Sequence, residues 1–200
     1  KIHRDLVDPL NALAADAKQA GFSLGVASGY RSFERQRLIW NAKAAGERPV
    51  LDGDEQPLVV PTMPADELMW AILRWSALPG GSRHHWGCDF DIYDAGALSA
   101  GAPLALTVIE TQTRFAAFYR WLEEYLVSGS DFIRPYSKPG AVACEPWHSS
   151  YLPLAKSYQA VVTPEALLAH LRRSDIRLMA SIEANFSAIY RDYIGDYFSE

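Results

Sequence analysis

The sequence predicts an α+β fold, in which a small antiparallel sheet is flanked by helices. Apolar residues recur every three or four positions over several segments, which is the spacing of amphipathic helices. Runs with alternate apolar residues lie at 22–27 and 86–93, and two further extended runs flank a Lys138-Pro139-Gly140 turn. Helices combined with a few strands, some paired as hairpins, make up the α+β class.

Length and composition indicate one globular domain over residues 1–200, with a C-terminal helical segment at about 163–195. The apolar fraction of 49% and the charged fraction of 22% are ordinary for such a domain. A net charge of -5 without any Lys/Arg-rich run argues against nucleic acid as a partner. No apolar run is long enough to span a membrane, and we expect a monomer.

Two cysteines, Cys88 and Cys144, are too few for a disulfide scaffold and lack C-x-x-C spacing. A thiolate would suit zinc, but alternation places Cys88 on the strand face opposite Asp91, so we expect buried structural thiols. The chain opens on Lys1 without a signal-peptide stretch. We therefore expect a trimmed or mature form, and composition leaves the compartment open.

In chain order, Leu6 to Ala17 has helical spacing and Gly21 ends this first helix. A strand at 22–27 follows, and Ser32 is expected to cap a helix that runs to about Ala45. Residues 46–64 are rich in Pro, Gly and acids, which predicts a loop or lid-like insertion with room for a short strand at 58–60. Helical spacing resumes over 65–78.

The strand at 86–93 is expected to place Cys88, Phe90 and Ile92 on one face and Asp89 and Asp91 on the other. Residues 95–107 give no clear prediction, whereas 113–127 is expected to be a helix. The runs at 132–136 and 141–148 predict a hairpin whose second strand ends near His148. Helices are expected to start at Thr163-Pro164 and to follow the apolar spacing of 176–193.

Two histidines and an aspartate are candidate ligands of a metal ion. His84 lies in a loop just before the strand that carries Asp91, and His148 lies far downstream. Three protein ligands of this kind leave a fourth position open, which is the arrangement of catalytic zinc sites. Nitrogen ligands with one carboxylate suit zinc better than calcium or magnesium. His85 is an alternative ligand, and Asp89, Tyr93 and Asp94 are either support for the ligands or polar residues at a strand end.

Three ordered blocks carry a resemblance to a known family. They are Ser28-Gly29-Tyr30-Arg31-Ser32-x-x-x-Gln36, then Ser82-x-His84-x-x-Gly87-x-x-x-Asp91, and then Glu145-x-Trp147-His148. The set resembles the zinc D-Ala-D-Ala carboxypeptidases of the VanY-like kind, whose fold group includes lysostaphin and Sonic hedgehog. His85, Trp86 and Asp89 depart from the residues that are common in relatives. These departures bear on substrate preference and leave the metal triad in place.

The resemblance implies a zinc metallopeptidase that removes the C-terminal D-Ala from peptidoglycan stem peptides in the bacterial cell envelope, either periplasmic or secreted. It implies Zn2+ on His84, Asp91 and His148, with Glu145 as the general base rather than only a partner that orients His148. Arg31, with Gln36 and Ser82, would bind the substrate carboxylate, because a guanidinium matches a carboxylate in shape and charge.

Three alternatives stay open at this stage. An L,D-carboxypeptidase or a stem-peptide endopeptidase would use the same scaffold, and a noncatalytic module would keep the metal without turnover. The presence of Glu145 speaks against the noncatalytic module, since a protein that only binds has no need of a base.

Overall fold

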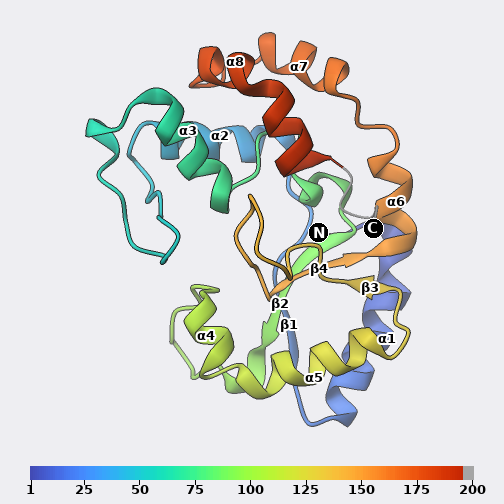
Figure 1. Ribbon diagram of the computed structural model, residues 1–200. Helices are drawn as coiled ribbons and strands as arrows, with labels where there is room; N and C mark the ends of the chain where they lie inside the picture. Colours follow the sequence, from blue (N-terminus) through green and yellow to red (C-terminus); the bar gives the residue numbers. More distant parts are fainter. Residues whose placement is uncertain (196–200) are drawn as a thin grey trace. The chain divides into compact units, whose positions relative to one another are not determined.

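The computed structural model describes residues 1–195 and divides the chain into two compact units (Figure 1). The first comprises residues 1–30, 86–137 and 144–157, and the second comprises residues 31–85, 138–143 and the described residues from 158 onward. Within the described residues, no helix is long and apolar enough to cross a membrane.

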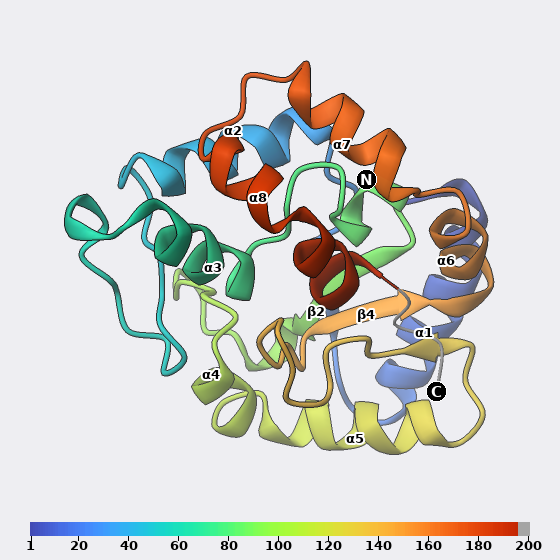
Figure 2. The same cartoon turned by 45° about the horizontal axis from the view of Figure 1, so that its top comes forward.

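The first unit contains a four-stranded antiparallel sheet in the order β1-β2-β4-β3. Its strands are β1 (Leu24–Ser28), β2 (Asp89–Asp94), β4 (His148–Tyr151) and β3 (Phe132–Ile133). Figure 2 shows β4 beside β2, and the register pairs Asp91 with His148 and Asp89 with Ser150. The predicted α+β class with a small antiparallel sheet is therefore confirmed.

The helices of this unit bury an apolar core against the sheet. They are α1 (Val7–Gln19), α4 (Val108–Gln112), α5 (Ala116–Val127) and the start of α6 (Leu152–Gln159). Phe90 and Ile92 of β2 are fully buried, and Tyr119 of α5 donates a hydrogen bond to the Ile92 carbonyl at 2.6 Å. Alternation along β2 thus places its core residues apart from the carboxylates at positions 89 and 91.

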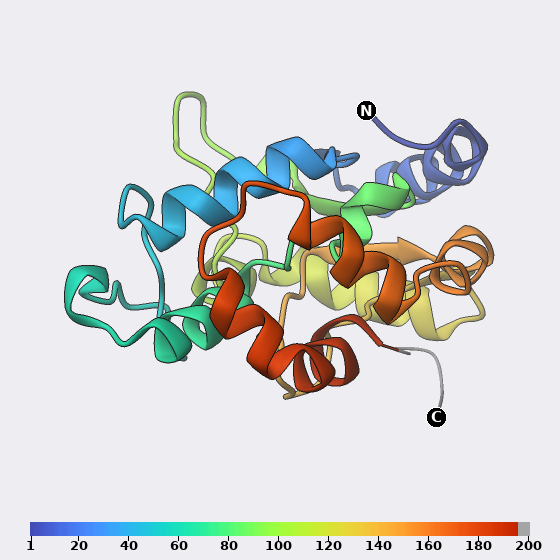
Figure 3. The same ribbon diagram turned by 90° about the horizontal axis from the view of Figure 1, so that it is seen from above.

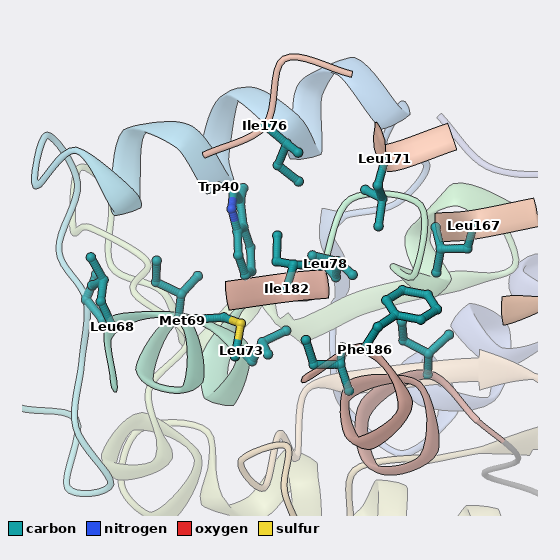
Figure 4. Close-up of a cluster of buried hydrophobic side chains, with 14 of the residues drawn as sticks. Trp40, Leu68, Met69, Leu73, Leu78, Leu167, Leu171, Ile176, Ile182 and Phe186 are labelled. Atoms are coloured by element: carbon teal, nitrogen blue, oxygen red, sulfur yellow. The ribbon is translucent and has the colours of Figure 1, made fainter. Parts of the chain in front are cut away.

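The second unit is helical, with α2 (Phe33–Ala44), α3 (Ala65–Trp75), α7 (Pro164–Arg172) and α8 (Met179–Ile189). Figure 3 shows α7 and α8 following one another through the connection at 173–178. The side chains between these helices form one apolar cluster (Figure 4) that includes Trp40, Met69, Leu171, Ile182 and Phe186. The Trp40 indole donates a hydrogen bond to the Arg177 carbonyl at 3.0 Å, so its buried N–H is satisfied.

Helix caps follow the predicted chemistry. The Ser32 hydroxyl accepts a hydrogen bond from the Arg35 amide at the start of α2, and the Thr163 hydroxyl does the same for Ala166 at the start of α7. The second of these helices also has Pro164 at its first position.

The 46–64 segment is a loop, as expected, and is tied down at several points. Leu51 and Pro57 form an isolated β-bridge, and Asp52 accepts hydrogen bonds from the backbone amides of Asp54 and Gln56. The Trp75 indole of α3 donates to the Asp52 carbonyl at 2.8 Å. The short strand expected at 58–60 is absent here, and Val60–Thr62 forms a 3-10 turn instead.

Several elements differ from the sequence predictions. The strand expected from residue 86 begins at Asp89, because Arg83–Trp86 forms a 3-10 helix and Gly87 has a φ of 73°. The helix expected over 113–127 begins at Ala116 as α5, and a separate, unpredicted helix α4 (Val108–Gln112) precedes it, because Thr113 leaves helical geometry. Helix α6 and the 3-10 turn Ala95–Ala97 were not predicted.

The predicted hairpin is only partly correct. β3 and β4 do pair antiparallel, but residues 134–147 form a loop and His148 begins the second strand rather than ending it. Pro135, Pro139 and Pro146 lie in that loop, and proline lacks the N–H that a strand ladder needs.

Candidate active site

Neighbouring strands of the first unit carry two carboxylates and a histidine. Asp89 and Asp91 come from alternate positions of β2, and His148 is the first residue of β4. All three side chains are buried. Because Asp91 and His148 are partners in the ladder, the sheet register itself holds them together.

The two ring nitrogens of His148 face different carboxylates. Nε2 lies 3.0 Å from Oδ2 of Asp89, and Nδ1 lies 3.3 Å from Oδ1 of Asp91. Burial lowers the pKa of His148, but hydrogen bonds and charge from Asp89 and Asp91 outweigh it and raise the pKa to about 9. Without a metal, the two carboxylates therefore favour the protonated form of His148.

Glu145 reaches the same imidazole from the preceding loop. Its Oε2 lies 3.6 Å from Nδ1 of His148. A turn fixes this approach, since the His148 amide donates to the Glu145 carbonyl at 3.1 Å and the Glu145 amide donates to the Tyr136 carbonyl at 3.0 Å. The Tyr136 ring meets the His148 ring edge-on at 4.8 Å. Nδ1 of His148 is thus the nitrogen that faces both Asp91 and Glu145.

Arg31 and Gln36 are joined in the second unit. Nη1 of Arg31 donates to Oε1 of Gln36 at 2.9 Å, and Nε2 of Gln36 donates to the Ala77 carbonyl at 2.7 Å. Gln36 is fully buried and bonded at both ends of its amide, so it holds the Arg31 guanidinium in place. Ser82 is buried in the loop before His84.

The His85 ring links the backbone of Arg31 to the turn at Gly80. The Gly80 amide donates to Nε2 at 3.0 Å, so Nδ1 carries the proton and donates to the Arg31 carbonyl at 2.6 Å. Burial, and more weakly the charge of Arg31, lower the pKa of His85, while the hydrogen bond to the Arg31 carbonyl opposes them. Both nitrogens are thus occupied by backbone groups, which does not suit the alternative role of His85 as a metal ligand.

Among residues 1–195, His84, Asp91 and His148 are a group that could hold a metal ion, with one ligand atom from each buried side chain. Two imidazole nitrogens and one carboxylate oxygen are the ligand set of catalytic zinc sites, so these residues fit that metal. His85 is not part of this group.

The role of Asp89 was left undecided by the sequence. Its alternation with Asp91 gave the only signal that it shares a face with the proposed ligand.

Both cysteines are free thiols. Cys88 is buried as expected, whereas Cys144 is only half-buried, contrary to expectation, because it lies in the loop before β4.

Comparisons with known proteins identify the family. The sequence model described as "VanY: D-alanyl-D-alanine carboxypeptidase" matches residues 1–154. Two uncharacterised proteins of Haemophilus influenzae are similar to the chain. One is 46% identical over 72 residues, which make up 36% of this chain and 49% of that protein. The other is 31% identical over 123 residues, which make up 58% of this chain and 92% of that protein. The match thus spans about half the length of the first relative.

Solved structures show the same fold. VanYB in complex with D-alanine-D-alanine is 27% identical, with a TM-score of 0.54 over 83% of this chain and 82% of that one. A zinc complex of a VanY D,D-pentapeptidase is 24% identical, with a TM-score of 0.54 over 90% and 83%. The LdcB LD-carboxypeptidase is 23% identical, with a TM-score of 0.55 over 91% and 68%. The chain therefore belongs to the VanY family of D-alanyl-D-alanine carboxypeptidases.

Proposed function

We propose that this chain is a zinc-dependent D,D-carboxypeptidase, which removes the C-terminal D-Ala from peptidoglycan stem peptides in the bacterial cell envelope. The observation that carries the proposal is the position of Nδ1 of His148, 3.3 Å from the Asp91 carboxylate and 3.6 Å from the Glu145 carboxylate. The Asp91 carboxylate would share a metal with this nitrogen, and the Glu145 carboxylate would move a proton.

His84, Asp91 and His148 would hold the zinc ion. When bound, zinc supplies a Lewis acid that polarises the scissile carbonyl and makes water a stronger nucleophile. The similar VanY D,D-pentapeptidase, whose structure is a complex with Zn(II), supports this choice of metal.

Glu145 would act as the general base. A carboxylate at this position accepts the proton of the attacking water and then passes it to the leaving amine, so that one residue serves both halves of the hydrolysis. Two backbone hydrogen bonds fix this part of the loop. The Glu145 amide donates to the Tyr136 carbonyl, and the His148 amide donates to the Glu145 carbonyl, so the Glu145 side chain is kept close to His148. A module that only bound a metal would not need a carboxylate at this place.

Arg31 would bind the carboxylate at the end of the substrate. Its guanidinium is already anchored by Gln36, so it loses less side-chain freedom on binding than a mobile arginine would. Gln36 would act on the substrate through Arg31, because both ends of its amide are bonded within the protein. Ser82 would add a neutral hydrogen bond to the carboxylate or the peptide.

Mass spectrometry of purified stem peptides tests this function. The zinc-loaded protein should shorten a pentapeptide that ends in D-Ala-D-Ala by one residue and leave the resulting tetrapeptide intact. Shortening of the tetrapeptide instead would identify an L,D-carboxypeptidase, and cleavage of cross-linked dimers alone would identify an endopeptidase. Absence of all three products from a protein that binds zinc would point to the noncatalytic module.

A further inference from the structure

Asp89 is a fully buried carboxylate that has no assigned role in the proposed reaction. It lies two residues before Asp91 on β2, next to the proposed metal ligands but not among them. Burial of an ionised carboxylate is costly unless hydrogen bonds compensate for the lost water. Its contacts therefore indicate its role.

The two oxygens of Asp89 have different partners on β4. Oδ2 lies 3.0 Å from Nε2 of His148, and Oδ1 accepts a hydrogen bond from the Ser150 hydroxyl at 2.8 Å. The Cys88 thiol lies 3.5 Å from the same Oδ1. Since Asp89 and Ser150 are directly paired in the ladder, Ser150 orients the carboxylate so that its second oxygen reaches diagonally to His148.

We propose that Asp89 is a positioning residue that makes His148 a zinc ligand through Nδ1. By accepting a hydrogen bond from the Nε2–H group, Asp89 keeps the proton on Nε2 and fixes the plane of the ring. Nδ1 is then aimed at the side that Asp91 and Glu145 occupy. Histidines that bind metals commonly donate their other ring N–H to a carboxylate or a carbonyl, and this partner strengthens metal binding. The inference rests on the proposed zinc function of His84, Asp91 and His148.

A purely structural role for Asp89 makes a different prediction. In that case, loss of the carboxylate would lower the stability of the fold, while a folded variant would bind zinc as the wild type does. A positioning role requires that zinc affinity change even in variants that stay folded. Zinc affinity and the state of the His148 Nε2 proton are therefore the measurements that separate the two.

Four variants make the test. Asp89→Ala removes the acceptor, and Asp89→Asn keeps the shape and one acceptor oxygen but removes the charge. Ser150→Ala removes the group that orients Asp89. Ser149→Ala is the matched control, because this neighbouring serine on the same strand is also buried and its hydroxyl has no hydrogen-bond partner among the described residues.

Zinc affinity would be measured by competition with a chromophoric chelator, with thermal unfolding as the check on folding. We expect Asp89→Ala to weaken zinc binding by about 10- to 100-fold, the usual effect of losing such a partner. Asp89→Asn should fall between Asp89→Ala and the wild type, and Ser150→Ala should show a smaller loss. Ser149→Ala should bind zinc as the wild type does. If Asp89→Ala proves unfolded, the Asp89→Asn result decides, since this side chain has the same size.

NMR of the metal-free protein with 15N-labelled histidine gives a second readout that needs no zinc. The Nε2 proton of His148 should be visible and slow to exchange in the wild type and in Ser149→Ala, and should be lost in Asp89→Ala. Wild-type zinc affinity in folded Asp89→Asn and Asp89→Ala would overturn the proposal while leaving the zinc function intact. A wild type that binds no zinc would instead overturn the zinc function, and the NMR experiment would still show whether Asp89 holds the ring.

Discussion

Oε2 of Glu145 lies 3.6 Å from Nδ1 of His148, so the carboxylate that would move the proton faces the same ring nitrogen that would bind the metal. Their relation is fixed by a turn that links the Glu145 carbonyl to the His148 amide. This short loop therefore couples two functions that the sequence separates by only two residues, and both can be tested.

The first prediction concerns the metal. The purified chain should bind about one zinc ion, as one three-ligand site with an open fourth position requires. His84→Ala and His148→Ala should each abolish tight binding, because two protein ligands are too few. Elemental analysis after extensive dialysis makes the measurement. Full occupancy in either variant would show that the ligand set is wrong.

The second prediction concerns the proton. Glu145→Gln keeps the shape of the side chain but removes the acceptor, so turnover should fall by roughly 100-fold or more. Zinc content should stay unchanged, because Glu145 is not a proposed ligand. Exposed Glu124 provides the control, and Glu124→Gln should turn over stem peptide like the wild type. Near-normal turnover by Glu145→Gln would make this residue only an orienting partner of His148.

The third prediction concerns recognition of the chain end. Arg31→Ala should lower kcat/KM on peptides with a free C-terminal carboxylate by one to two orders of magnitude, since a charged hydrogen bond contributes about 1.5 to 3 kcal/mol. Peptides with an amidated C-terminus should be poor substrates of the wild type, and Arg31→Ala should change kcat/KM on them little. Arg31→Lys should restore part of the loss, because a point charge cannot make the two-pronged contact.

Arg35→Ala is the matched control for this substitution, as Arg35 is exposed and contributes its backbone amide to the Ser32 cap. It should leave both substrates unaffected. Equal losses on the acid and the amide in Arg31→Ala would mean that Arg31 supports the fold, and the endopeptidase would become the better candidate.

The fourth prediction concerns pH and the metal-free protein. The pKa of His148 is about 9 in the folded chain against an ordinary value of 6.5, so its proton stabilises the fold. This contribution is fully present below pH 6.5 and is lost as the pH rises through about 9. The thermal midpoint of the zinc-free protein should therefore fall over that range. In His148→Gln, the thermal midpoint should fall less over this pH range. If it falls as much as in the wild type, groups other than His148 cause the decrease.

The fold and the family could be predicted from the sequence because the signals were local. Alternation along 88–92 identified the core face of β2, and Ser32 and Thr163 marked helix starts through their hydroxyl groups. The family prediction is confirmed by the match over residues 1–154.

Other features depend on contacts between distant segments and were missed for that reason. Period two alone did not reveal that Gly87 interrupts the strand with a positive φ, or that the 134–147 loop delays β4 until His148. Nor could spacing show which nitrogen of His148 faces Asp89, since this depends on the register of β2 and β4. Arg31 and Gln36 were expected to bind the same substrate carboxylate. Their spacing did not show that they would bond to each other, or that Gln36 would bond to the Ala77 carbonyl 41 positions away.

The 46–64 segment has a practical consequence for protein engineering. Its proline-rich, acidic composition is that of a linker, the kind of place where tags are inserted and proteases cut. Yet the Leu51–Pro57 bridge closes it upon itself, and the Trp75 indole anchors its Asp52 carbonyl to α3. An insertion between residues 51 and 57 would disturb these links, so a surface label is better attached outside the segment, for example at the exposed side chain of Glu124 on α5.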